Sequence, residues 1–413
     1  MIYFSTVYIL IQNIFLNLLL SLVLCITSVL AYDFLKKIIK EKYLTMAKAL
    51  LLGGSGAMGV YLVPELIRLG FDIVVTSRSV RKSDNDKLAY IQGNAHEEEF
   101  IKKILADKYD VIVDFMVYPT KEFLDRYELF LKNTKHYIFI SSCRVFAESD
   151  EPITENTPRL LDVSKDTEYL ATDEYALAKA RQENILRESP YKNWTIIRPS
   201  ITYSKNRFQL GTLEADTIIF RTQCNCPVIL PQEMLQKQTS MTWAGDVAKM
   251  IAHLVLNQNA FEEDYNTVSH EHCSWEDIFL YYQKLIGLKL IPVKLDDYIK
   301  IIGGKYQVLL SRMYNRVMDN TKILKATGIP KESLISIYDG LSRELQNPNI
   351  SKFIKIDYVK NAGMDRITHS KISLEKANVK EKFLYYSSYL GVYMLLKYVK
   401  NRLNSHFGLL SYT

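Results

Sequence analysis

Residues 46–59 read Met46-Ala-Lys-Ala-Leu-Leu-Leu-Gly-Gly-Ser-Gly-Ala-Met-Gly59, an apolar run that ends in a glycine-rich turn. The apolar part predicts a buried parallel strand over 47–52. The glycines follow the spacing Gly-x-x-Gly-x-x-Gly, which permits a tight turn and a close approach of the backbone to a ligand. Helical periodicity then covers 57–69 and stops at Gly70. This order of strand, turn and helix predicts a phosphate-binding loop, because the start of the helix offers free N–H groups.

The rest of the chain repeats the alternation of strands and helices. It predicts an α/β fold with a doubly wound parallel sheet of the Rossmann type. After residue 200 the pattern is less regular and indicates a smaller C-terminal lobe that faces the substrate, so that 46–345 form one NAD(P)-binding domain with its substrate lobe. The predicted strands are 71–76, 88–91, 109–115, 136–140 and 194–197, and the predicted helices are 97–108, 121–131, 168–187, 244–256 and 275–286.

The net charge of +6 is concentrated at the two ends of the chain. Residues 1–45 carry +2 and residues 351–413 carry +7, which leaves −3 for the centre. A negative centre argues against nucleic acid as a partner. The five cysteines are scattered and odd in number, which favours a reducing, cytoplasmic compartment over a disulfide framework. The spacings in 224–226 and 270–273 do not match a metal site, so we expect no metal.

Each end allows two interpretations. The apolar run 7–32 is long enough to span a bilayer, and the lysines that follow it would keep the remainder on the cytoplasmic side. Alternatively, Met46 is the true start and 1–45 is not translated. Residues 346–413 form a basic, Tyr-rich tail with a predicted cationic helix at 383–403. That helix either lies on a membrane surface or packs back on the core or on a second subunit, and we favour packing over membrane contact.

The end of the second strand bears on the choice of cofactor. An acidic residue there would hold the ribose 2′-hydroxyl of NAD, but the sequence is Thr76-Ser-Arg78-Ser79. Because Arg78 suits a 2′-phosphate, we predict NADP, with NAD as the alternative. The predicted cofactor contacts are Gly53, Gly56, Ala57, Met58, Gly59, Arg78, Asn94, Tyr175 and Lys179.

A Tyr-x-x-x-Lys pattern places Tyr175 and Lys179 on one face of a predicted helix. A neighbouring ammonium group favours the phenolate and brings the pKa of a tyrosine toward neutral pH, where it can exchange protons. Ser142 follows the strand predicted at 136–140, and ligands bind at the carboxyl ends of parallel strands. Ser142, Tyr175 and Lys179 are therefore the predicted catalytic set.

Four motifs in this order give the chain a family resemblance. They are Gly-x-x-Gly-x-x-Gly at 53–59, Ser-Ser-x-x-Val-Phe at 141–146, Tyr-x-x-x-Lys at 175–179 and Ile-Arg-Pro at 197–199. Over about 47–290 the chain resembles the extended short-chain dehydrogenase/reductases, most of all the NAD-dependent epimerase/dehydratase family. The resemblance implies that Ser142 binds a substrate oxygen, Tyr175 is the acid–base, and Lys179 tunes Tyr175 and binds cofactor. It also implies a nucleotide-linked sugar as substrate and a homodimer. Arg207, Arg221 and Arg312 could meet the diphosphate of such a substrate, although each taken singly is better explained as a surface residue.

Three departures mark a divergent member. Cys143-Arg144 stands where the 4,6-dehydratases carry Asp-Glu, which disfavours a dehydratase. The fourth strand ends in 113–117 (Val-Asp-Phe-Met-Val) instead of His-Leu-Ala-Ala, and Val145-Phe146 replaces Val-Tyr-Gly. We therefore expect an NAD(P)-dependent epimerase or ketoreductase that acts by hydride transfer. The alternative is a non-catalytic NADP-binding scaffold or redox sensor.

Overall fold

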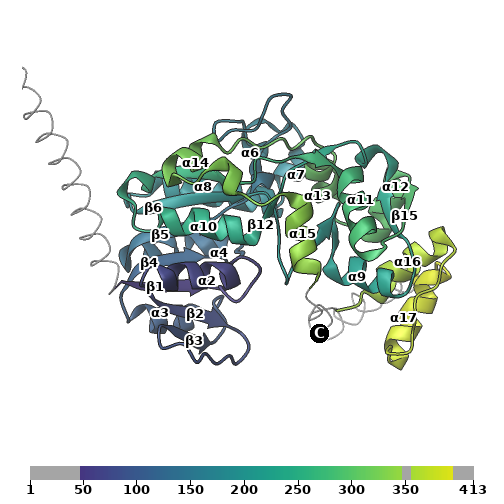
Figure 1. Ribbon diagram of the computed structural model, residues 1–413, viewed down its shortest axis with the longest axis horizontal. Coiled ribbons are helices and arrows are strands. Elements are labelled where there is room, and N and C mark those ends of the chain that lie inside the picture. The colour runs from purple at the N-terminus through teal and green to yellow at the C-terminus, as the bar shows by residue number, and fades with distance from the viewer. Residues whose placement is uncertain (1–46, 347–354, 394–413) are drawn as a thin grey trace, which may run out of the picture.

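A computed structural model describes residues 47–346 and 355–393. A seven-stranded parallel sheet forms its larger half, as predicted (Figure 1). The strand order is β13-β6-β5-β4-β1-β2-β3, so the winding reverses between β1 and β4, where such sheets open a crevice at their carboxyl ends. The strands are β1 (Lys48–Leu52), β2 (Asp72–Ser77), β3 (Leu88–Gln92), β4 (Tyr109–Asp114), β5 (Thr134–Ile140), β6 (Trp194–Pro199) and β13 (Glu263–Thr267).

Helices cover both faces of this sheet, which explains why the central strands are apolar throughout. In β1, Ala49 and Leu51 pack into the core beneath one layer of helices, while Leu50 and Leu52 pack beneath the other. Alternate side chains of a strand point to opposite faces, so a strand buried on both sides needs no polar alternation. The first layer holds α2 (Gly59–Arg68), α10 (Ala244–Leu254) and α14 (Thr321–Thr327), and the second holds α3 (Glu98–Leu105), α4 (Thr120–Leu124), α5 (Tyr127–Lys132) and α8 (Tyr175–Glu188).

Two helices predicted as continuous are each broken in the structure. The segment predicted at 168–187 forms α7 (Thr167–Leu170) and α8. The Thr172 hydroxyl donates a 2.7 Å hydrogen bond to the carbonyl of Tyr169 just after α7, and the carboxylate of Glu174 accepts one of 2.8 Å from the N–H of Ala176. Side chains that bond the local backbone in this way end and begin helices. The predicted helix 121–131 is likewise divided into α4 and α5.

The smaller lobe lies beside the sheet and has its own hydrophobic core (Figure 1). The division is not a single cut in the sequence, because α10, β13 and α14 return to the larger half after residue 200. The main elements of the lobe are β7 (Ile201–Tyr203), α9 (Ala215–Gln223), β10 (Val228–Pro231), β12 (Met241–Trp243), α11 (Trp275–Ile286), β15 (Leu290–Val293), α12 (Leu295–Ile302), α13 (Lys305–Gln307) and α15 (Ile337–Leu345).

The described part of the basic tail packs on this lobe. It forms α16 (Tyr358–Thr368) and α17 (Val379–Tyr389), which lie against each other at the outer end of the lobe (Figure 1). The helix predicted at 383–403 begins earlier than expected, because Asn378 and Glu381 form a capping box before α17. Residues 394–413 lie outside the described residues.

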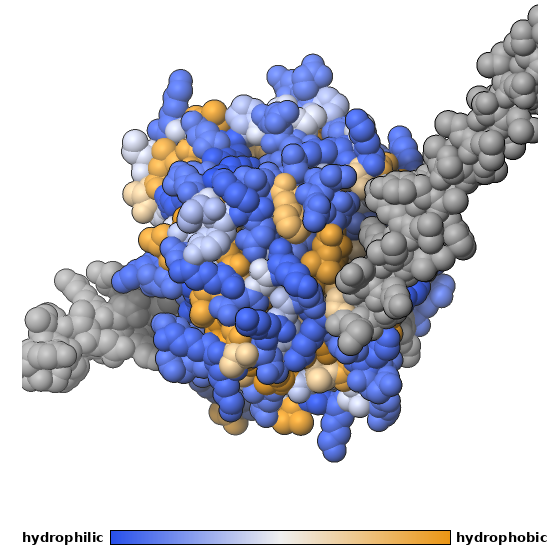
Figure 2. All heavy atoms as spheres, turned by 90° about the vertical axis from the view of Figure 1, so that its left-hand side faces the viewer, coloured by the Kyte–Doolittle hydropathy of each residue, from blue (hydrophilic) through white to orange (hydrophobic). Residues whose placement is uncertain are grey.

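The predicted membrane segment, 7–32, also lies outside the described residues. Within the described ranges, no helix combines the length and the apolar character needed to cross a bilayer. On the face shown in Figure 2, apolar side chains are scattered among hydrophilic ones. Scattered apolar side chains are usual on a protein surface and by themselves indicate no binding site.

Candidate active site

The glycine-rich turn between β1 and α2 has the geometry that its spacing predicts. Gly53 adopts φ +68°, a conformation that glycine accepts readily. A Cβ on Gly59 would lie 2.1 Å from the carbonyl oxygen of Gly54, so only glycine lets α2 begin this close to the turn. The N–H of Gly53 donates a 2.9 Å hydrogen bond to the Thr76 hydroxyl, which ties the turn to the end of β2. Gly56 differs, because its added Cβ would make only ordinary contacts.

This turn forms one wall of a cavity of about 320 Å³, which we call the cofactor cavity. Four of the predicted cofactor contacts line it: Gly53, Gly56, Arg78 and Asn94. Among the described residues that line it, none is acidic. The lining consists of 53, 55, 56, 76–78, 93–96 and 115–117.

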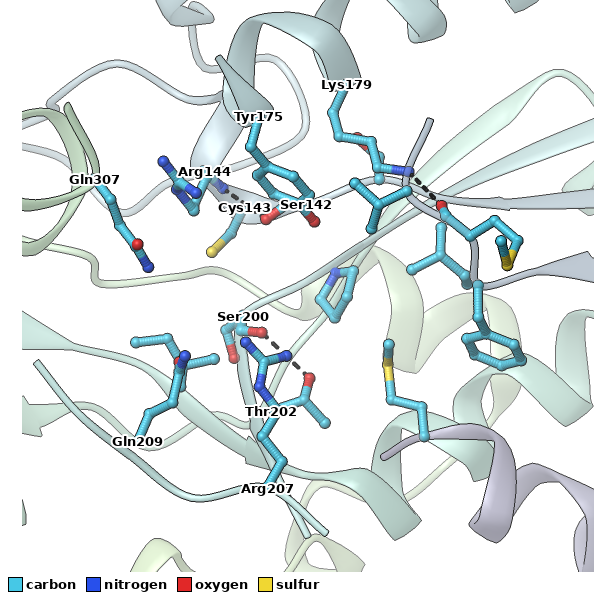
Figure 3. A pocket seen from close by; sticks show the side chains of 18 of the residues that line it. Ser142, Cys143, Arg144, Tyr175, Lys179, Ser200, Thr202, Arg207, Gln209 and Gln307 are labelled. Atoms are coloured by element: carbon cyan, nitrogen blue, oxygen red, sulfur yellow. Dashed lines mark hydrogen bonds between the residues drawn. The ribbon is translucent and has the colours of Figure 1, made fainter. Parts of the chain in front are cut away.

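A second cavity of about 400 Å³, the substrate cavity, adjoins the first, and residues 115–117 line both. Ser142, Tyr175 and Lys179 all line it, although they come from the end of β5 and from α8 (Figure 3). Met58, a predicted cofactor contact, also lies here. Ala57 and Gly59 line neither cavity. The structure therefore brings the three predicted catalytic residues into one cavity that shares residues 115–117 with the cofactor cavity.

Tyr175 is the first residue of α8, and its ring is covered by a cation. The guanidinium carbon of Arg144 lies 5.0 Å from the centroid of the Tyr175 ring, and Arg144 also forms an ion pair with Glu174. Burial raises the pKa of Tyr175 above its ordinary value, whereas Arg144, Arg207 and the Ser142 side chain lower it. The nearby cations thus partly offset the effect of burial and favour the phenolate.

Lys179 lies one turn further along α8 and is only 1% exposed. Its ammonium group donates a 3.1 Å hydrogen bond to the carbonyl of Met116 and lies 4.4 Å from the centroid of the Phe139 ring. Burial lowers the pKa of Lys179 to about 8, although the carboxyl groups of Asp114 and Glu183 act in the opposite direction. Lys179 therefore helps to hold residues 115–117, the segment that lines both cavities.

The main cations acting on Tyr175 differ from the one that the sequence indicated. The motif suggested Lys179, but the largest cationic influences on the pKa of Tyr175 are those of Arg144 and Arg207. In the sequence, Arg144 is a departure from the family pattern. Its position two residues after Ser142 was a usable signal, because the ends of parallel strands face the ligand.

The smaller lobe supplies two glutamines that the sequence did not indicate and two of the three arginines considered for a diphosphate. Gln209, Gln307 and Arg312 line the substrate cavity, and Arg207 reaches it from a loop near β7. Arg221, whose guanidinium suits a diphosphate by chemistry alone, is 0% exposed and forms a 2.9 Å ion pair with Asp365. It belongs to the contact with α16 and not to the site. The described residues include no group of three or more side chains able to hold a metal ion.

Comparison with known proteins gives a match to one family model, to a curated protein and to solved structures. Residues 53–224 match a family model described as NAD(P)H-binding. A UDP-glucose 4-epimerase from Lactobacillus helveticus is 29% identical in an alignment that covers 27% of this chain and 40% of that protein. The chain thus matches less than half the length of that curated relative. The resemblance to the epimerase/dehydratase family is confirmed.

Solved structures of epimerases share the fold at low sequence identity. An epimerase from Methanothermobacter thermautotrophicus has a TM-score of 0.59 and 15% identity, and the match covers 77% of this chain and 98% of that one. A UDP-glucuronic acid 4-epimerase from Bacillus cereus, solved with UDP-glucuronic acid and NAD, has a TM-score of 0.57 and 16% identity, with 74% and 99% covered. At these identities the likeness concerns the fold.

Proposed function

We propose that the protein is an NAD(P)-dependent epimerase or ketoreductase that acts on a nucleotide-linked sugar, with Tyr175 as its acid–base. The observation that carries the proposal is the meeting of Ser142, Tyr175 and Lys179 in a cavity that shares residues 115–117 with the cavity beside the glycine-rich turn. Two of the named relatives are UDP-sugar epimerases, which supports a nucleotide-linked sugar as the substrate class.

Each side chain has a distinct part in this proposal. The Ser142 hydroxyl orients the reacting substrate oxygen. The Tyr175 phenolate takes the proton of that oxygen, and the hydroxyl so formed returns it. Arg144 and Arg207 favour the phenolate form of Tyr175. Lys179 keeps residues 115–117 in place between the cavities and offers its ammonium group to the cofactor ribose. The nicotinamide supplies hydride transfer when it is bound.

The lining of the cofactor cavity fits a dinucleotide and supports NADP over NAD. The close packing of Gly59 on Gly54 leaves the N-terminus of α2 near the turn, where a pyrophosphate binds in this fold. The cavity lacks a carboxylate among its described lining residues and includes Arg78, which is exposed at its rim. We expect fluorescence titration to give tighter binding of NADPH than of NADH. Arg78→Gln should lower NADPH affinity about tenfold and leave NADH affinity unchanged, because only NADPH carries the 2′-phosphate.

Tyr175→Phe tests the catalytic assignment. Removal of one hydroxyl should lower turnover at least about 100-fold, because general acid–base catalysis contributes on that order. NADPH binding should stay unchanged, which would separate a chemical defect from a folding defect. Turnover equal to that of the wild type would refute the role of Tyr175. Wild-type protein that binds NADPH but converts no nucleotide-linked sugar would support the non-catalytic alternative instead.

A further inference from the structure

The substrate cavity is strongly cationic. Its lining includes four basic side chains, Arg144, Lys179, Arg207 and Arg312, and no carboxylate among the described residues that form it. The ammonium group of Lys179 already donates a hydrogen bond to the carbonyl of Met116, in the segment 115–117 that lines both cavities. Three arginines therefore remain to meet the substrate.

Arg312 lies on the smaller-lobe side of the cavity and is 4% exposed. Its guanidinium donates to the carbonyl of Gly211 at 2.8 Å, to the Ser311 hydroxyl at 3.0 Å and to the Gln209 side-chain oxygen at 3.4 Å. All three partners are neutral, and burial lowers the pKa of Arg312 to about 10. A buried cation without a counter-charge is costly, so a bound anion would offset a cost already present in the free protein.

Arg144 occupies a different position, beside Tyr175 and Ser142. In Figure 3 Arg144 and Tyr175 lie on one side of the cavity, whereas Arg207 enters from the opposite side near Thr202. The ion pair with Glu174 fixes the orientation of Arg144 but does not satisfy all of its donors, since its buried Nε has no hydrogen-bond partner. A buried donor without a partner destabilises the free protein.

The cavity therefore has two cationic regions, one at Arg144 and one at Arg207 and Arg312. We next ask which part of a single substrate each region would contact. The reacting hydroxyl of a nucleotide-linked sugar must lie at Tyr175, and the diphosphate is attached at another carbon of the sugar ring. Arg207 and Arg312 are therefore placed for the diphosphate, and Arg144 is not needed for it. We propose that the sugar itself carries a carboxylate next to the reacting hydroxyl and that Arg144 recognises this group. This inference rests on the proposed function.

If a substrate carboxylate binds beside Tyr175, the reaction also needs Arg144. A negative charge next to a phenol disfavours the phenolate, whereas Arg144 favours it. Pairing the carboxylate with Arg144 would keep Tyr175 able to accept a proton. The same arginine thus selects the substrate and preserves the acid–base.

The test compares UDP, UDP-glucose and UDP-glucuronic acid as ligands of the full chain loaded with NADPH. Calorimetric titration should give at least about tenfold tighter binding of UDP-glucuronic acid than of UDP-glucose, as a charge-assisted hydrogen bond would produce. Arg144→Gln should reduce this ratio to about one with UDP affinity unchanged, and Arg144→Lys should retain part of it. The matched control, Arg207→Gln, should weaken all three ligands together.

Equal binding of the two sugars by the wild type would overturn the inference, and so would a ratio that survives in Arg144→Gln. In either case UDP binding would leave the proposed nucleotide-sugar site standing. A protein that binds NADPH but none of the three ligands would overturn the proposed substrate class as well. Circular dichroism of each variant separates a lost ratio from a lost fold.

Discussion

Lys179 and Glu183, one turn apart on α8, differ in how many charged and hydrogen-bonding partners the protein gives them. Glu183 accepts hydrogen bonds from Arg198 and from the Ser141 hydroxyl, each at 2.7 Å, and these partners together with Arg187 overcome burial and hold its pKa at about 2. Lys179 has one hydrogen bond to a backbone carbonyl, and burial holds its pKa at about 8. Glu183 is therefore a structural anchor, and its network holds the end of β5 against α8. Lys179 keeps donors for a ligand.

His136 gives the protein a predictable response to acid. Its Nδ1 accepts the N–H of Leu256 at 3.0 Å and its Nε2 lies 2.8 Å from the Thr195 hydroxyl, so the buried ring is neutral. Burial lowers the pKa of His136 to about 3. The unfolded state therefore binds the proton more readily, and stability should fall as pH drops from 6.5 toward 3. The slope is about 1 kcal/mol per pH unit.

Urea unfolding at pH 7.5, 6 and 5 would measure this slope. His136→Gln should be less stable at pH 7.5 and should lose less stability on acidification than the wild type. His253→Gln, at an exposed position, is the matched control and should keep the wild-type slope. Identical slopes for His136→Gln and the wild type would contradict the assignment.

At the scale of elements, two glycines near the start of α2 have different roles: Gly59 permits close packing, and Gly56 lines the cofactor cavity. A methyl group on Gly59 would collide with the backbone of Gly54, whereas one on Gly56 would be 3.6 Å from the nearest backbone oxygen. Gly59→Ala should therefore cost about 1–3 kcal/mol of stability, as overpacking does. Gly56→Ala should keep the stability within about 0.5 kcal/mol but weaken NADPH binding, because Gly56 lines the cofactor cavity.

Urea unfolding and NADPH titration of the two variants together make this comparison. Equal stability of Gly59→Ala and Gly56→Ala would show that α2 can move away from β1 without cost. Unchanged NADPH affinity in Gly56→Ala would place the cofactor elsewhere than against the turn.

At the scale of the whole molecule, α16 and α17 are joined to the smaller lobe by one buried polar cluster. Asp365 is fully buried, pairs with Arg221 of α9, and accepts hydrogen bonds from the Tyr385 hydroxyl and the N–H of Ile372, both at 2.8 Å. Asp365→Asn would leave Arg221 without a counter-charge. The new side-chain amide would also bring an N–H donor close to the Tyr385 hydroxyl and the N–H of Ile372, which are themselves donors. We expect a loss of about 3–5 kcal/mol.

Hydrogen exchange in α16 and α17 and the urea midpoint would both report this loss. The matched control is Asp297→Asn, since Asp297 and Lys300 form a largely exposed pair at 3.9 Å. That substitution should change stability by less than about 1 kcal/mol. A similar effect of the two substitutions would mean that α16 and α17 are held mainly by apolar contacts.

The sequence by itself determined the parallel sheet, the glycine-rich turn and the resemblance to epimerases. These features can be predicted from short segments of the sequence, because a buried strand, a tight turn and an i, i+4 pair depend on residues only a few positions apart. The break before Tyr175 escaped the same reasoning, because helical periodicity does not register the single hydrogen bond by which Thr172 ends α7.

Only the tertiary structure decided which cations meet the site. Arg144, Arg207 and Arg312 come from three distant segments, and their convergence depends on how the smaller lobe packs against the sheet. Arg221 has the same chemistry as Arg312 but is paired within the lobe, a difference that no local pattern contains. The position of a charged side chain relative to a cavity is set by long-range packing, so the charge of the substrate cavity became visible only in three dimensions.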